Sequence, residues 1–245
     1  MSIFTDEYSF KNFVVGHSND VAYTCALEIA KEPGVNYNPL FIYGKTGTGK
    51  THMMNAIGLY IKENNQDMNI LYLTAEQFAE EIVAAIRNGS IEEMDKKYGE
   101  IDVLLIDEIQ YIAGREKTQE EFFRIFNLLY SNDKQIVLAS NIEPRRMQNL
   151  EGRIYSRFVR GIVVEIKSPD EKIKDGILNK YIGKLGVQLS LSVKEFILNS
   201  VTNVFEIEGL VNKLFIFAKL NNISDGDITA SFAKEILGIE DQITD

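Results

Sequence analysis

Cysteine and histidine are scarce in this sequence of 245 residues. Cys25 is the only cysteine, and His17 and His52 are the only histidines. A lone cysteine excludes a disulfide within the chain and a zinc site built from cysteines. A metal ion would therefore have to be held by oxygen ligands, which suits a hard cation such as Mg²⁺.

Long apolar runs and an excess of basic charge are also missing. Apolar runs such as Val103–Ile106 and Ile162–Val164 fall far below the roughly 20 residues of a membrane-spanning helix. Met1 is not followed by a basic stretch and an apolar core, so we expect no secretory signal and a cytoplasmic protein. The net charge of -10 argues against a surface broadly built to neutralise duplex DNA, although a local basic patch is compatible with it.

Five short apolar runs typical of strands recur through the first two-thirds of the chain. They alternate with segments whose apolar residues recur at helical spacing, such as residues 21–30 and 78–86. This alternation indicates a parallel sheet covered by helices on both faces, which we expect in an α/β domain over residues 1–167. The expected strands are Leu40–Tyr43, Ile70–Leu73, Val103–Ile106, Gln135–Ala139 and Ile162–Ile166.

After the short turn Ser168-Pro169-Asp170 the strand pattern stops, and we expect a second, all-helical domain over residues 168–245. Its expected helices are Ile173–Ile182, Val193–Val201, Ile207–Leu220 and Ile228–Leu237. In the first domain, Ser18 is the expected cap of the helix near residues 21–30. Thr74 with Gln77, and Thr118 with Glu121, form the pattern of a capping box at two further helix starts.

The segment Gly44–Thr51 matches G-x-x-x-x-G-K-[ST] between an expected strand and an expected helix. Glycines let backbone N–H groups surround phosphates, and the helix N-terminus adds a partial positive charge. Lys50 is expected to reach the outer phosphates, and the Thr51 hydroxyl to ligate Mg²⁺. A glycine-rich turn with a chance lysine is the alternative, which the order of strand, loop and helix disfavours. The residues assigned to the nucleotide are Gly44, Thr46, Gly47, Thr48, Gly49, Lys50 and Thr51.

Asp107 and Glu108 directly follow the apolar run Val103–Ile106. In a buried parallel strand this position opens into the ligand crevice, where Asp107 would support Mg²⁺ and Glu108 would orient and deprotonate a water molecule. Two solvated acids at a strand end are the alternative, which the phosphate loop upstream makes less attractive. Asn141 follows the end of the fourth expected strand and could hold the same water, although asparagine is also a common loop residue.

These elements together resemble the AAA+ ATPases and, among them, the bacterial replication initiators of the DnaA family. The resemblance spans most of the first domain and includes a lid-helix motif in the second. The similar stretches are Tyr8–Gly16, Tyr37–Gly44, Leu104–Gln110, Thr118–Phe123 and Asn203–Gly209.

The resemblance implies roles that spacing alone does not reveal. Phe13, Val14 and Gly16 would line the adenine site. Arg157 would be the arginine finger that reaches the ATP of a neighbouring subunit, with Arg153 in support. A guanidinium supplied across an interface couples assembly to nucleotide state, because it stabilises the developing charge only when subunits meet. Without the resemblance, a solvated surface charge is the simpler interpretation of either arginine.

In the family, helices between the second and third strands face a channel for single-stranded DNA, and the resemblance assigns Val83, Arg115 and Lys117 to this role. Lysine and arginine contacts to phosphate suit a protein that recognises a strand rather than a sequence. Val83 also fits an apolar core stripe. Arg115 and Lys117 also fit an exposed charged turn.

One departure from the family pattern concerns the lid. Phe205 stands where the family usually has an arginine that senses the outer phosphate, and no arginine follows Arg160. We therefore expect weakened hydrolysis or weakened nucleotide-dependent closure, unless a lysine such as Lys213 or Lys219 substitutes. Glu108 and Asn141 stand where the family more often has aspartates, and both suit hydrolysis. The chain ends at Asp245 without a duplex-reading helix-turn-helix domain, as expected of a truncated core or a short paralogue.

Three functions fit these expectations. The first is an ATP-dependent assembly switch in replication initiation, with slow turnover, which binds ATP or ADP with Mg²⁺, self-associates and contacts single-stranded DNA. The second is a regulator or helicase-loader-like adaptor that binds nucleotide, hardly hydrolyses it, and contacts a replicative helicase or another initiator. The third is a small-molecule kinase, which lacks any indication of an acceptor pocket.

Overall fold

The computed structural model describes residues 4–201, 203–223 and 228–237, and these residues form two compact units. The first unit comprises the described residues up to Phe13 together with Asn19–Lys167. The second comprises Val14–Ser18 and the described residues from Ser168 onward. A short segment near the N-terminus therefore packs with the helical part of the chain.

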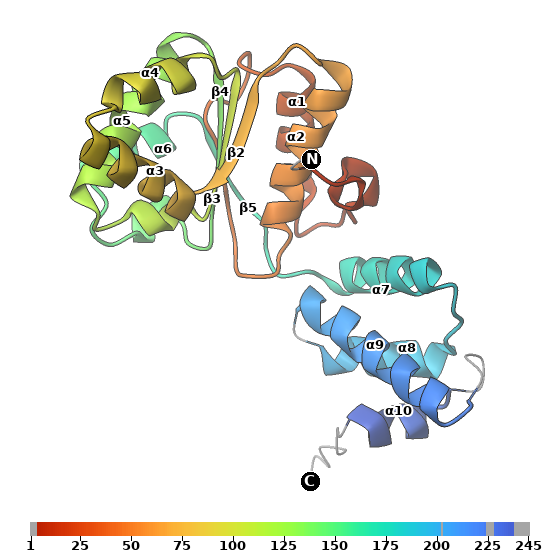
Figure 1. Ribbon diagram of the computed structural model, residues 1–245. Helices are drawn as coiled ribbons and strands as arrows, with labels where there is room; N and C mark the ends of the chain where they lie inside the picture. The colour runs from red at the N-terminus through yellow and green to blue at the C-terminus, as the bar shows by residue number, and fades with distance from the viewer. Residues whose placement is uncertain (1–3, 202, 224–227, 238–245) are drawn as a thin grey trace. The chain divides into compact units, whose positions relative to one another are not determined.

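A five-stranded sheet lies at the centre of the first unit, and each pair of neighbouring strands is parallel. Strands β3 and β4 are buried along their whole length, as their apolar sequences require. The strand order β2-β3-β4-β1-β5 brings the carboxyl ends of β1, β3 and β4 to the same edge (Figure 1). The strands are β1 Leu40–Tyr43, β2 Ile70–Thr74, β3 Val103–Asp107, β4 Gln135–Ser140 and β5 Ile162–Glu165. The predicted parallel sheet is confirmed.

Helices cover both faces of the sheet, because alternate strand residues point to opposite sides. Leu40 and Ile42 pack in the cluster with α1 and α2, whereas Phe41 packs in the cluster with α3, α4, α5 and α6. Figure 1 shows these two layers on opposite sides of the strands. The helices of this unit are α1 Asp20–Lys31, α2 Lys50–Asn64, α3 Ala75–Asn88, α4 Ile91–Gly99, α5 Glu116–Ser131 and α6 Gly152–Phe158.

The helix starts confirm one capping prediction and correct two. Thr74 and Gln77 make both hydrogen bonds of a capping box at the start of α3. The Ser18 prediction is wrong, because α1 begins at Asp20 and the Ser18 N–H donates to Asp170 Oδ2 at 3.4 Å. The Thr118 prediction is also wrong, because α5 already begins at Glu116 and Thr118 is buried in its first turn.

The second unit is helical, as predicted, with an apolar core of its own. Its helices are α7 Glu171–Leu185, α8 Leu191–Ser200, α9 Val204–Leu220 and α10 Ala230–Leu237. Buried Leu178, Val193 and Val211 lie in this core together with Ala233. Across the described residues of both units, the structure contains no helix long and apolar enough to span a membrane.

Candidate functional site

The segment between β1 and α2 has the backbone that a phosphate-binding loop requires. Gly47 has φ 82° and Gly49 has φ 103°, a conformation that glycine adopts without a steric cost. A Cβ at Gly44 would collide with the carbonyl oxygen of Ile166. The loop is anchored to the sheet, because the Gly44 N–H donates to the Ser140 carbonyl at 3.2 Å. Helix α2 then begins at Lys50, so its free N–H groups open toward the loop.

Lys50 is held by the loop that it follows. Its Nζ donates to the carbonyl oxygens of Gly44 at 2.8 Å and of Lys45 at 2.9 Å. Burial lowers the pKa of the Lys50 ammonium, and the nearby carboxylates of Asp107 and Glu108 act in the opposite direction. The structure thus brings Lys50 near both predicted acidic residues.

Asp107 is the buried acceptor at the end of β3, with only 3% of its surface exposed. Its Oδ2 accepts from Thr51 Oγ1 at 2.7 Å and from Tyr72 Oη at 3.3 Å. Its Oδ1 accepts from the Glu108 N–H at 2.8 Å. Burial and the Asp107 carboxylate raise the pKa of Tyr72, so this hydroxyl remains a donor.

Oxygen atoms from Thr51 and Asp107 are the donors that Mg²⁺ prefers. No group of three or more His, Cys, Asp or Glu side chains suited to a metal occurs among the residues that the structure describes. A magnesium ion at this site would accordingly complete its shell with phosphate oxygens and water, as it commonly does in nucleotide sites. The residues present fit the predicted metal.

Glu108 and Asn141 lie at the ends of adjacent strands and are both exposed. Glu108 has φ 54° and ψ 39°, a left-handed conformation that non-glycine residues adopt mainly where the surroundings enforce it. Its neighbour Gln110 accepts from the Asn141 N–H through Oε1 at 3.3 Å. The turn after β3 therefore also fixes the start of the loop after β4.

The three residues predicted for adenine fall in different units. Phe13 is buried in the first unit, where its ring lies edge-on to His52 with the centroids 5.0 Å apart. A Cβ at Gly49 would lie 3.1 Å from that ring. Val14 and Gly16 belong to the second unit. There a Cβ at Gly16 would lie 2.6 Å from Ile173 Cγ1, so the backbone approaches α7 closely.

Arg157 lies on α6 and packs against α5. Its Nε donates to Asn127 Oδ1 at 3.0 Å, and its guanidinium carbon lies 5.2 Å from the centroid of the Phe123 ring. Arg153 lies over the same ring at 4.9 Å, and its Nε donates to Glu151 Oε2 at 2.6 Å. The structure therefore places both predicted arginines around one aromatic side chain.

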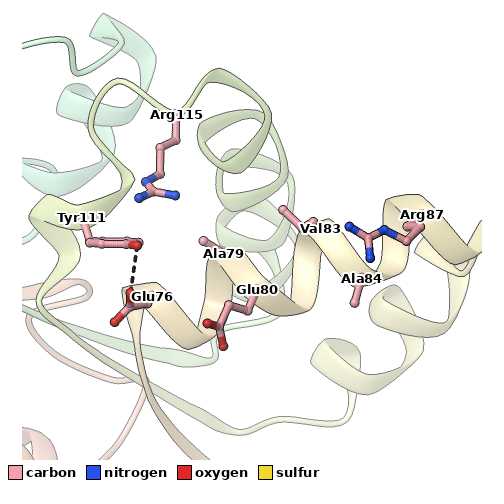
Figure 2. Close-up of a pocket in the computed structure, with 8 residues that line it drawn as sticks. All are labelled: Glu76, Ala79, Glu80, Val83, Ala84, Arg87, Tyr111 and Arg115. Carbon is pink, nitrogen blue, oxygen red and sulfur yellow. Dashed lines mark hydrogen bonds between the residues drawn. The ribbon is translucent and has the colours of Figure 1, made fainter.

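Val83 and Arg115 line one shallow groove of about 260 Å³ beside α3. Val83 is 52% exposed, so the alternative that it belongs to the core is wrong. The Arg115 guanidinium lies 3.9 Å from the centroid of the Tyr111 ring, and Tyr111 Oη donates to Glu76 Oε1 at 2.9 Å. Figure 2 shows Arg115 and Tyr111 facing α3, which also contributes Arg87 to the groove.

Lys117 does not line this groove. It lies in the first turn of α5, where it is exposed and its Nζ lies 3.3 Å from Glu120 Oε2. Arg115 and Lys117 both follow β3, whereas Val83 lies between β2 and β3. The prediction that the DNA-contacting residues lie between the second and third strands is therefore wrong for Arg115 and Lys117, which follow β3. The contact of all three residues with DNA stays a prediction.

Several side chains that support these residues were not predicted. Tyr72 holds Asp107, Tyr111 lies beneath Arg115, and Asn127 holds Arg157. Tyr72 and Asn127 support their partners from a separate strand or helix, and no spacing rule links positions 35 and 30 residues apart. Tyr111 precedes Arg115 in the same segment after β3. On α9 of the second unit, Phe205 is 67% exposed, and Lys213 and Lys219 are exposed as well.

The first unit has a parallel sheet with a phosphate loop after β1. A buried aspartate at the end of β3 is hydrogen-bonded to the loop threonine, and a helical unit follows in the chain. These features together define a P-loop ATPase of the AAA+ class. The family model for the bacterial DnaA ATPase domain matches residues 4–165. The chain belongs to this family.

Known relatives agree with this assignment. The chromosomal replication initiator protein DnaA of Nautilia profundicola is 44% identical over 237 residues, which is 96% of this chain and 53% of that protein. The chain thus spans about half the length of this curated relative. The crystal structure of domain III of the Thermotoga maritima replication initiation protein DnaA matches with a TM-score of 0.88 and 36% identity. That match covers 97% of this chain and 98% of the other.

A third match is a replication initiator DnaA bound to AMPPCP and single-stranded DNA. It has a TM-score of 0.82 and 37% identity, and covers 91% of this chain and 67% of that chain.

Proposed function

We propose that this chain binds ATP with Mg²⁺ and uses the bound nucleotide to assemble with further copies of itself on single-stranded DNA during replication initiation. The hydrogen bond between Thr51 and Asp107 carries this proposal, because it brings the loop hydroxyl and the strand carboxylate together as a Mg²⁺ site requires. A related initiator that binds AMPPCP and single-stranded DNA supports it. Residues 1–167 act as the nucleotide-binding domain in this proposal, and residues 168–245 as the lid.

In the proposed chemistry, backbone N–H groups of Gly44–Thr51 bind the phosphates and Lys50 donates to the outer ones. Thr51 and Asp107 would hold Mg²⁺, which would neutralise phosphate charge when bound. Glu108 accepts a proton from the attacking water, and Asn141 orients that water. Phe13, Val14 and Gly16 are proposed to line the adenine site.

Arg157 is the proposed finger that contacts the ATP of a neighbouring copy. The guanidinium is pre-organised by Asn127 and Phe123, which support the side chain without neutralising it. The Arg153 guanidinium also lies over the Phe123 ring. The Arg157 charge would stabilise the interface only with ATP bound, because ADP lacks the outer phosphate that the guanidinium contacts.

Single-stranded DNA is proposed to bind in the groove of Val83 and Arg115, with Lys117 as an additional phosphate contact. The exposed Val83 side chain offers an apolar surface for a base, and Arg115 offers charge for the backbone. Fluorescence anisotropy with a labelled oligonucleotide tests this. Arg115→Ala should weaken binding, whereas equal affinity of Arg115→Ala and the wild type would contradict the groove assignment.

The adaptor hypothesis also has a specific observation in its favour. Phe205, in the position expected for a lid arginine, is largely exposed and has no charge with which to contact a phosphate. A steady-state ATPase assay with and without single-stranded DNA separates the two hypotheses. Slow turnover that DNA stimulates supports the assembly switch, whereas nucleotide binding with no turnover in either condition supports the adaptor.

A further inference from the structure

Arginines are concentrated in one short stretch of an acidic chain. Five of the eight arginines lie between residues 145 and 160, although the net charge is -10. Arg153 and Arg157 lie four residues apart on α6, and Arg160 lies just beyond the end of this helix. All three share one face, because each contacts a side chain of α5. This face packs along α5 (Figure 1).

Arg160 is held in the same way as Arg157. Its Nε donates to Tyr130 Oη at 2.9 Å, and its guanidinium carbon lies 4.5 Å from the centroid of the Tyr130 ring. Arg157 pairs in the same manner with Asn127 Oδ1 and the Phe123 ring. The supports Phe123, Asn127 and Tyr130 follow each other at spacings of four and three residues on α5, which matches the spacing of the arginines.

The charge of the supporting groups distinguishes these arginines from their neighbours. Arg153 is paired with the Glu151 carboxylate, and Arg145 with the Glu143 carboxylate. Arg157 and Arg160 are held by neutral oxygen atoms, and no carboxylate pairs with either one among the residues that the structure describes. A guanidinium that is oriented but not neutralised keeps both its charge and its terminal N–H donors for an external anion.

We propose that Arg160 is a second interface arginine, which acts beside Arg157 and docks on an acidic surface of another copy of this chain. The proposal rests on the proposed function, because Arg157 of the same face is the finger directed at that copy. The net charge of -10 reflects an excess of acidic side chains, so another copy of this chain is a partner of complementary charge. Tyr155 and Val159, which are 38% and 41% exposed beside these arginines, favour a protein partner over nucleic acid, because exposed apolar side chains next to arginine typify protein interfaces.

Sedimentation velocity with AMPPCP and with ADP tests this inference on the full chain. Arg160→Gln should raise the protein concentration at half-assembly with AMPPCP by about tenfold, the effect of losing one charge-assisted hydrogen bond. Tyr130→Phe keeps the ring and removes the oxygen that holds Arg160, so it should shift assembly in the same direction by a smaller factor. Arg145→Gln is the matched control, because it removes an equal charge that Glu143 already neutralises.

The outcomes distinguish failure of the Arg160 role from failure of the proposed function. If Arg157→Gln assembles like the wild type, the proposed function fails. If Arg157→Gln loses assembly while Arg160→Gln behaves like Arg145→Gln, the role of Arg160 is overturned and the proposed function stands. Nucleotide affinity of the monomer should be unchanged in Arg160→Gln, which excludes a general folding defect. If Arg160→Gln instead weakens binding of single-stranded DNA by the monomer and leaves assembly intact, this face binds nucleic acid and the second copy is the wrong partner.

Discussion

Two hydrogen bonds hold the Lys50 side chain within the phosphate loop. Its ammonium group sits among the Gly44 and Lys45 carbonyl oxygens, close to the Asp107 and Glu108 carboxylates. These acceptors orient the side chain along the loop. The same donors are therefore positioned for the outer phosphates in the proposed complex.

Replacing Lys50 by alanine should weaken binding of MgATP by about 10- to 100-fold, because charge-assisted hydrogen bonds contribute about 1.5–3 kcal/mol. Isothermal titration calorimetry measures the effect. Lys62→Ala, which removes an exposed lysine from the last turn of the same helix, is the control and should bind like the wild type. Affinity of Lys50→Ala equal to that of the control would contradict the assigned role.

Site residues near a motif could be predicted from the sequence, whereas their supports could not. Thr51, Asp107 and Glu108 follow from the loop pattern and the apolar strand that precedes the acids. Tyr72 holds Asp107 from the neighbouring strand β2, and this contact depends on the strand order. Asn127 and Arg157 are 30 residues apart and meet only because α6 packs on α5.

At the scale of elements, the start of α3 has the capping box that its sequence predicts. Thr74 Oγ1 accepts from the Gln77 N–H at 3.2 Å, and Gln77 Oε1 accepts from the Thr74 N–H at 2.9 Å. Because both partners lie within one turn, this box could be predicted from sequence. The Ser18 and Thr118 predictions failed because distant contacts decide those helix starts, through Asp170 for Ser18 and through burial for Thr118.

Thr74→Ala should lower the free energy of unfolding by about 1 kcal/mol, because it removes the acceptor of an N-terminal cap. Urea denaturation followed by circular dichroism measures this loss. Thr24→Ala, which replaces an exposed threonine inside α1, serves as the control and should change stability little. Equal stability of both variants would show that the cap contributes nothing to the folded chain.

Asp102 links three segments of the first unit and makes stability depend on pH. It accepts from the Asn69 N–H at 2.9 Å and from Lys134 Nζ at 2.7 Å. Desolvation raises its pKa, but the hydrogen bonds from Lys134 and Asn69 and the charge of Lys134 outweigh this, so the pKa of Asp102 lies below its ordinary value. The Asp102 carboxylate therefore stabilises the folded chain at pH values above its pKa in the unfolded chain. This stabilisation is lost as the pH falls through its pKa in the folded chain.

Asp102→Asn should therefore unfold at lower urea than the wild type near pH 6, and the difference should shrink as the pH falls below the ordinary pKa of an aspartate. Urea titrations at a series of pH values test this. The control is Asp67→Asn, an exposed carboxylate on the surface, which should follow the wild type. A difference that stays constant or grows toward acid pH would contradict the assigned linkage.

At the scale of the whole molecule, the sequence predicted an α/β unit followed by helices, because periodicity and the loop pattern are local. The packing of Val14–Ser18 with the helical unit was not predicted, since it depends on contacts between Gly16 and Ile173 far along the chain. The predicted cytoplasmic location and the contacts with a helicase or another initiator remain predictions. Assembly through Arg157 is the central claim of the proposed function.

Sedimentation velocity of the wild type and of Arg157→Ala, with ADP and with AMPPCP in the presence of single-stranded DNA, tests this claim most directly. We predict that AMPPCP drives the wild type into assemblies larger than those with ADP, and that Arg157→Ala stays small in both. Both proteins remaining monomeric with every nucleotide, or both assembling equally, would contradict an ATP-dependent assembly switch.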